Sequence, residues 1–149
     1  MTDRAQSARL SFRLAAEFGH RDVTGELEQL VARSGVQTGI LVVQLVGSTG
    51  AITTIEYEPG ALADLRRALE VMASTEQPYA HNARWGDGNG FAHVRSALLK
   101  TSLCIPIVDG RLVLGQWQQV VVLNLDNRAR QREVVALVTG TETTASGAG

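Results

Sequence analysis

Hydrophobic residues recur along this chain with the period of strands in some segments and the period of helices in others. Residues 9–14 alternate between apolar side chains and arginine or serine, which predicts a half-buried strand. Residues 40–46 are mostly β-branched and almost wholly apolar, so we expect a central strand covered on both faces. Residues 51–57 form a further β-prone run after the small-residue turn 47–50.

Two segments carry helical spacing instead. Residues 24–34 place leucine and valine at helical intervals and end before Gly35, a residue that commonly terminates helices. Residues 59–72 repeat leucine in the same way after Pro59, which fits the first turn of a helix. These patterns predict the two main helices of the molecule.

The C-terminal half is rich in β-prone residues. Asp109-Gly110 is a strong signal for a tight hairpin between strands over 103–108 and 111–114, and further strands are expected over 117–125 and 133–139. The order of elements predicts an α+β fold: a mostly antiparallel sheet, barrel-like or sandwiched, with two main helices packed on it. We expect one domain over residues 1–140 and a disordered tail over 141–149.

Charge and composition exclude several classes of protein. The 149 residues carry 14 lysines and arginines against 15 acids, so no basic face for binding nucleic acid is expected. No apolar run reaches the ~20 residues of a membrane span, and the N-terminus has no apolar signal-peptide core, so we expect a cytoplasmic protein. Cys104 is the only cysteine, and its apolar neighbours predict a buried position.

Candidate chemistry gathers in residues 74–95, a long and polar connection that also carries aromatic rings. His81 and His93, two of the three histidines, flank Asp87. Imidazoles with a carboxylate can bind Zn or another divalent ion, and the same set can transfer protons near neutral pH. The spacing matches no known zinc signature, and the alternative is a loop held together by hydrogen bonds from these side chains.

The run 87–90 places Asn89 between two glycines. It can form two overlapping turns, or it can present backbone amides and a side-chain amide to an anion. A short helix that includes His93 and extends to Leu99 follows at once, and helix N-termini favour phosphate. Arg84 or Arg95 could bind that phosphate.

Other polar residues leave two interpretations each. Ser48 and Thr49 can bind a ligand or cap their turn. Glu56 can be a ligand, a base or a solvated residue at a strand end. Strand alternation at Trp117 and Gln118 would direct the ring to the core and the amide to a pocket.

Three co-linear segments carry recognisable motifs: residues 47–60 (GSTGAITTIEYEPG), residues 81–95 with HNARWGDGNG and HVR, and residues 109–118 with DGRL and LGQWQ. Together they resemble the YjbQ-like family, whose members are described as secondary thiamine-phosphate synthases. The resemblance implies a small α+β domain that assembles as a homotrimer with a polar pocket. It further implies that a set of residues lines this pocket: His81, Asp87, Asn89, His93, Trp117 and Gln118, with Glu56 as a further candidate.

The resemblance also implies an activity, which is weak in the family. It joins a pyrimidine diphosphate to a thiazole phosphate and releases pyrophosphate. In this chain Asp87 and Glu56 would hold Mg²⁺, and a histidine would donate a proton. Many members carry a histidine where this chain has Gly47, so one family ligand or acid-base group is missing here.

Two functions therefore remain in view. The first is an enzyme that acts on a phosphorylated small molecule, with catalytic His81, Asp87 and His93. The second is a non-catalytic trimeric module that binds a metal through His81 and His93, or an anion or other small molecule. A purely structural protein would leave the polar cluster in residues 74–95 without a purpose.

Overall fold

The computed structural model describes residues 2–143, and within them the chain forms two antiparallel sheets and four helices, which confirms the α+β prediction. The helices are α1 (Thr24–Ser34), α2 (Pro59–Met72), α3 (Ala80–Trp85) and α4 (Gly90–Leu99). The strands are β1 (Thr2–Leu14), β2 (Gly19–Asp22), β3 (Thr38–Val46), β4 (Gly50–Ile55), β5 (Ser102–Val108), β6 (Arg111–Leu112), β7 (Gln119–Asn124) and β8 (Arg130–Glu142). None of these helices is both long and apolar enough to cross a bilayer.

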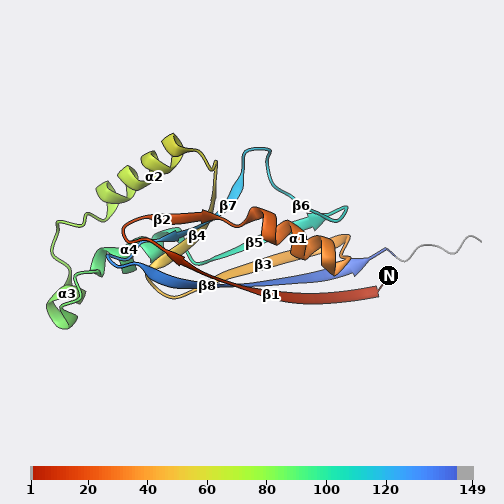
Figure 1. The fold of residues 1–149 in the computed structure, drawn as a ribbon, viewed down its shortest axis with the longest axis horizontal. Coiled ribbons are helices and arrows are strands. Elements are labelled where there is room, and N and C mark those ends of the chain that lie inside the picture. The colour runs from red at the N-terminus through yellow and green to blue at the C-terminus, as the bar shows by residue number, and fades with distance from the viewer. Residues whose placement is uncertain (1, 144–149) are drawn as a thin grey trace, which may run out of the picture.

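The two sheets form layers. The larger sheet has the order β1-β8-β3-β5-β6 and the smaller has the order β2-β7-β4, with every pair antiparallel. Figure 1 shows the long strands of the larger sheet side by side, with α2 lying beyond the smaller sheet. The antiparallel strands curl into a half-barrel, the barrel-like one of the two predicted arrangements, and the smaller sheet lies between the larger sheet and helices α2 and α4.

Strand β7 is buried on both faces and joins two cores. Val120 and Val122 pack with α1 and the inner face of the larger sheet. Val121 and Leu123 pack instead with residues of α2 and α4. Each fully buried aliphatic side chain of this kind stabilises the fold by about 1.5–3 kcal/mol. Strand β7 therefore joins the core between the two sheets to the core beneath α2 and α4.

Local sequence signals explain where several elements begin and end. The carboxylate of Glu58 accepts hydrogen bonds from the amides of Gly60 and Ala61 at 2.8 Å each and so caps α2. Asp109 and Gly110 have φ angles of 50° and 72°, the two positive values that a tight hairpin turn between β5 and β6 requires.

The terminal strands are longer than predicted. Strand β1 starts at Thr2 and pairs with β8 in continuous register as far as Glu142, where Arg4 forms an ion pair at 2.7 Å. A second cross-strand ion pair joins Arg9 to Glu133. Polar side chains hid this pairing from the hydrophobic pattern. The expected disordered tail is wrong for residues 141 and 142, which belong to β8, and residues 144–149 lie outside the described part.

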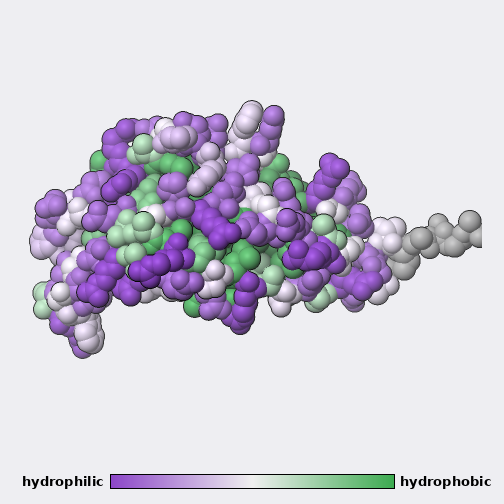
Figure 2. Space-filling view, in the orientation of Figure 1, coloured by the Kyte–Doolittle hydropathy of each residue, from purple (hydrophilic) through white to green (hydrophobic). Residues whose placement is uncertain are grey.

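The larger sheet has one face without a cover in this chain. Strand β3 is central, as predicted, but only Leu41, Val43 and Leu45 are buried, while Ile40 and Val42 are exposed. The expectation that β3 is covered on both faces is therefore wrong for the single chain. Cys104 was also expected to be buried and is exposed on this outer face. Apolar side chains also reach the surface in the view of Figure 2, where they gather over the middle of the molecule among polar ones.

Candidate functional site

A cleft of about 480 Å³ opens where four segments meet: the β3–β4 turn, α3, the start of α4 and the β7–β8 turn. Six of the residues singled out in the sequence line it: Ser48, Thr49, His81, Asp87, Asn89 and His93. Three charged residues that the sequence analysis did not select also line it: Asp126, Arg130 and Arg132. A volume of this size suits a small organic ligand.

The two histidines form a pair at one wall. His81 lies in α3 and His93 in the first turn of α4, and their ring centroids are 4.5 Å apart with the planes tilted by 43°. The Nδ1 atom of His81 is buried and has no hydrogen-bond partner among residues 2–143. A buried imidazole nitrogen without a partner is costly unless a ligand uses it.

Asp126 is wholly buried beneath the cleft. Its carboxylate accepts hydrogen bonds from the Thr49 hydroxyl and from Nε of Arg130, each at 2.9 Å, and a longer one from the Asn89 amide. Burial raises the pKa of Asp126, but the hydrogen bonds from Thr49, Arg130 and Asn89 and the charge of Arg130 outweigh it, so the pKa lies below its ordinary value. Asp126 is therefore an anion already neutralised by protein groups.

Arg132 is the second buried charge. One terminal nitrogen of its guanidinium, Nη2, donates to the carbonyl and hydroxyl of Thr49 at 2.9 Å and to the side-chain oxygen of Asn124. Burial lowers the pKa of Arg132, and the charge of Asp126 opposes this shift. Nε has no partner among the described residues, although the side chain is only 5% exposed. The acceptor Oδ1 of Asn89 is also buried without a hydrogen-bond partner among the described residues.

The loop between α3 and α4 is held against the β7–β8 turn. Gly86 and Gly88 have φ near +70°, which only glycine adopts freely, and they allow the sharp reversal between the helices. The Asn127 side-chain amide donates to the Asp87 carbonyl at 3.0 Å. As a result α4 starts at the cleft, and the positive end of its dipole faces the space beside Arg132.

Four predicted site residues lie outside the cleft: Glu56, Trp117, Gln118 and Arg95. Glu56 is exposed just after β4. Trp117 lies in the β6–β7 connection and is 67% exposed, so the prediction that its ring fills the core is wrong. Gln118 donates to Thr54 across this loop.

Arg95 points to the other side of α4. Its guanidinium lies 4.9 Å from the centre of the Phe91 ring, donates to the Ala73 carbonyl and pairs with Glu70 at 2.6 Å. Glu70 also accepts hydrogen bonds from the Thr75 backbone and Ser74, and its pKa is lowered to about 2, mainly by the Thr75 amide and then by Arg95. Arg95 thus joins α2 to α4 and does not line the cleft.

The sequence did contain a signal for one of the two missed arginines, Arg132. Arg132 is in phase with Val134, Ala136 and Val138 on the buried face of β8. A charge on the apolar face of a strand must be paired or functional. The predicted strand began one residue later, at residue 133, so this arginine fell outside it.

The side chains present do not fit a tightly held metal ion. Zinc sites use at least three protein ligands, and within residues 2–143 no three histidine, cysteine or acidic side chains come together. His81 and His93 supply two donors at most, so tight binding would need a donor from outside this chain.

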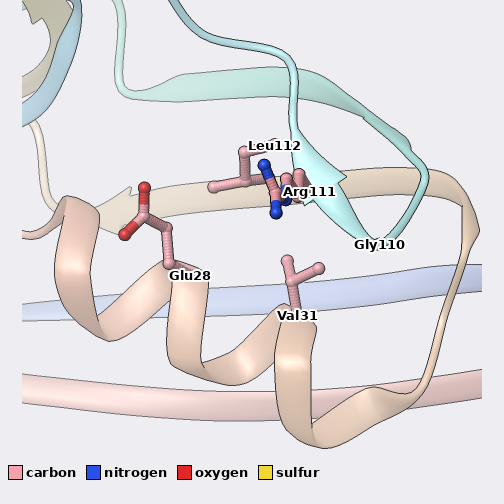
Figure 3. A pocket seen from close by; sticks show the side chains of 5 residues that line it. All are labelled: Glu28, Val31, Gly110, Arg111 and Leu112. Carbon is pink, nitrogen blue, oxygen red and sulfur yellow. The ribbon is translucent and has the colours of Figure 1, made fainter. Parts of the chain in front are cut away.

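Figure 3 shows a different hollow, between α1 and the β5–β6 hairpin. Its volume is about 350 Å³, and Glu28, Val31, Arg111 and Leu112 line it together with Gly110. Apolar side chains share this hollow with one acid and one arginine. This hollow shares no lining residue with the cleft, where the polar and charged side chains of the candidate site gather.

Comparisons with known proteins agree on one family. The sequence model described as UPF0047 protein YjbQ-like matches residues 8–141. A UPF0047 protein of Methanothermobacter thermautotrophicus is 34% identical over 119 residues, which cover 80% of this chain and 81% of that protein. A UPF0047 protein of Synechocystis is 39% identical over a segment that covers 77% of this chain and 79% of that protein. The crystal structure of a Sulfolobus solfataricus protein of unknown function has a TM-score of 0.88 at 26% identity, covering 94% of this chain and all of its own. The chain belongs to the YjbQ-like UPF0047 family.

Proposed function

We propose that this is a cytoplasmic protein whose cleft binds the phosphate group of a phosphorylated small molecule. Arg132 carries the proposal: it is a buried cation that lines the cleft and has an unused Nε donor. Guanidinium groups are well suited to phosphate, and a buried donor without a partner is satisfied when an anion arrives.

The charges around the cleft support an anionic ligand. Asp126 accepts its hydrogen bonds from Arg130, Thr49 and Asn89 and takes none from Arg132, whose Nε has no partner among the described residues. The start of α4 adds the positive end of a helix dipole. The histidine pair adds ring nitrogens that can donate hydrogen bonds or a proton.

The activity that we propose for this cleft is a slow thiamine-phosphate synthase-type transfer. The bond between the pyrimidine methylene carbon and the diphosphate oxygen breaks, and the pyrophosphate leaves with the electron pair. The thiazole nitrogen supplies its lone pair and forms the new carbon–nitrogen bond. Arg132 would stabilise the charge that develops on the departing phosphate, and His93 would supply a hydrogen bond or a proton to it.

A non-catalytic binding module is the second candidate. Departure of pyrophosphate is normally assisted by Mg²⁺, which protein carboxylates hold together with the substrate phosphates. Asp87 is exposed in the cleft and Glu56 lies outside it, so these two acids do not share a metal within one chain. These features favour binding without turnover.

Turnover assays with a matched control separate the two candidates. The wild type, His93→Ala and His20→Ala would be incubated with the pyrimidine diphosphate and the thiazole phosphate, and thiamine phosphate would be measured. The catalytic proposal expects slow product formation that falls at least tenfold in His93→Ala and persists in His20→Ala, because His20 lies on β2 outside the cleft. Ligand binding without product would support the module, and turnover indifferent to His93 would contradict the site.

We also propose a homotrimer built on the outer face of the larger sheet. Val42 lies opposite Cys104 on β5 and opposite Leu137 on β8, and all three side chains are exposed. Ile40 and Val108 extend the same apolar surface. Contiguous exposed apolar side chains of this kind mark protein interfaces.

A further inference from the structure

A second hollow adjoins the cleft on the side of the α4–β5 connection. It has a volume of about 330 Å³ and shares Gly47, Ser48 and His93 with the cleft. Its other lining residues are Ser96, Ala97, Lys100 and Thr101, and none of the described residues that line it is acidic. The hollow therefore carries the positive charge of Lys100 with no negative charge beside it.

Lys100 is the only lysine of the chain, and its backbone is strained. Its φ is 76° and its ψ is 163°, a combination that is essentially confined to glycine. Two backbone hydrogen bonds hold it there: the Lys100 amide donates to the Ser96 carbonyl at 2.9 Å, and the Lys100 carbonyl accepts from Ile52 at 3.2 Å. The strain is thus fixed by the surrounding fold.

The strained lysine gains no compensating ion pair within residues 2–143. A glycine would adopt this conformation without cost, so the folded chain would be more stable with glycine at position 100. Strain that a simple substitution could remove is typical of functional positions. Lys100 lines a hollow that continues into the cleft, which indicates a ligand as the partner of its charge.

Gly47 lies on the boundary between the two hollows and contributes no side chain to it. A Cβ atom at this position would lie 3.1 Å from Nη1 of Arg132, which places the guanidinium directly beside the boundary. Arg132 on one side and Lys100 on the other therefore serve neighbouring parts of one space. His93 lines both parts.

We propose that Lys100 binds a second anionic group of the ligand whose phosphate binds beside Arg132. The inference rests on the proposed function and narrows its substrate class to phosphorylated compounds that carry a second anion, either another phosphate or a carboxylate. An ammonium group on a flexible stem can satisfy either one.

Calorimetric titration at low ionic strength tests this inference with three probes: inorganic phosphate, pyrophosphate and phosphonoacetate. The wild type should bind pyrophosphate or phosphonoacetate about tenfold more tightly than phosphate, and the preferred probe identifies the second group. Lys100→Gln and Lys100→Gly should lose this preference, Lys100→Arg should keep it, and phosphate affinity should be equal in all four proteins. Lys100→Gly should also melt at a higher temperature than the wild type, whereas Lys100→Gln should not.

The outcomes distinguish this inference from the function on which it rests. If phosphate binds but the wild type shows no preference, or Lys100→Gln retains it, Lys100 has no ligand role and the proposed function stands. If the wild type does not bind phosphate at all, both the proposed function and the role of Lys100 are overturned.

Discussion

At the scale of single residues, the cleft is defined by two buried charges, Asp126 and Arg132. Asp126 and Arg132 lie beneath the cleft, and each is held by hydrogen bonds from neighbouring strands and turns. Asp126 has all its partners within the protein, whereas Arg132 keeps Nε unused. This asymmetry is the physical reason to expect an anion and not a cation in the cleft.

Glu70 provides a test of residue-scale electrostatics. Its pKa is lowered from 4.5 to about 2, so the carboxylate stabilises the folded state above pH 4.5 and this contribution is lost as pH falls toward 2. Glu70→Gln should lower the free energy of unfolding by about 1 kcal/mol at pH 7, a value reduced for the screening of a partly exposed group. Urea denaturation at pH 7, 4 and 2 should show the difference from the wild type vanish at pH 2.

Glu28→Gln is the matched control for that series. Glu28 is exposed on α1 and makes no ion pair among the described residues. Its replacement should change stability by less than about 0.5 kcal/mol at each pH. A Glu70→Gln effect that stays constant from pH 7 to pH 2 would show that the carboxylate charge is not what stabilises the α2–α4 contact.

Strands β3 and β8 approach each other unusually closely at one pair of glycines. Gly39 and Gly140 are register partners, and a Cβ on Gly140 would lie 2.2 Å from the Thr38 carbonyl oxygen. Gly140→Ala must therefore displace the backbone of β3. We expect a loss of at least about 2 kcal/mol of unfolding free energy in chemical denaturation.

Gly25→Ala gives the opposite expectation for the same chemical change. Gly25 lies in α1, and a Cβ there meets no atom within 4 Å. Alanine should stabilise the helix by about 0.5 kcal/mol because it restricts the unfolded chain. Equal effects of the two substitutions would contradict the close approach of β3 and β8.

Helices and strands with a clear hydrophobic period could be predicted from the sequence, whereas the shortest elements could not. Helix α2 runs over the predicted residues because leucine spacing, Pro59 and the Glu58 cap all agree. Strand β2 and helix α3 were missed because four or six residues are too few for a period, and their neighbours hold them in place. Strand β3 was found, but apolar residues on both of its faces concealed which face the chain itself covers.

The shape of the whole molecule depends on what covers the outer face of the larger sheet. Val42→Asp places a charge at the centre of the apolar row between Cys104 and Leu137. If the homotrimer uses this face, light scattering after gel filtration should show a trimer for the wild type and a smaller species for Val42→Asp. Thiol reagents should modify Cys104 faster in the variant.

Val71→Asp is the control for the assembly. Val71 is 82% exposed on α2, away from the larger sheet, so the charge should leave the trimer intact. A wild type that elutes as a monomer, or equal dissociation by both variants, would show that the outer face is not the interface.

Within the assembled molecule, the sequence predicted many of the residues that line the cleft but gave no role to its two buried charges, Asp126 and Arg132. Ser48, Thr49, Asn89 and the two histidines were selected from loops rich in glycine and polar side chains. Arg132 and Asp126 were not, because their roles arise only when the β7–β8 turn folds beneath the β3–β4 turn. Contacts between residues 49 and 132 follow from strand pairing that no local pattern encodes.

The most direct test of the account is a phosphate titration followed by two-dimensional ¹H–¹⁵N NMR of the assigned protein. The account predicts saturable shifts of the Arg132 Nε–H signal and of the backbone amides of residues 47–49 and 90–93, with the Nε–H signal of Arg95 unchanged as an internal control. No shift at Arg132, or shifts centred on another surface, would contradict phosphate binding in this cleft.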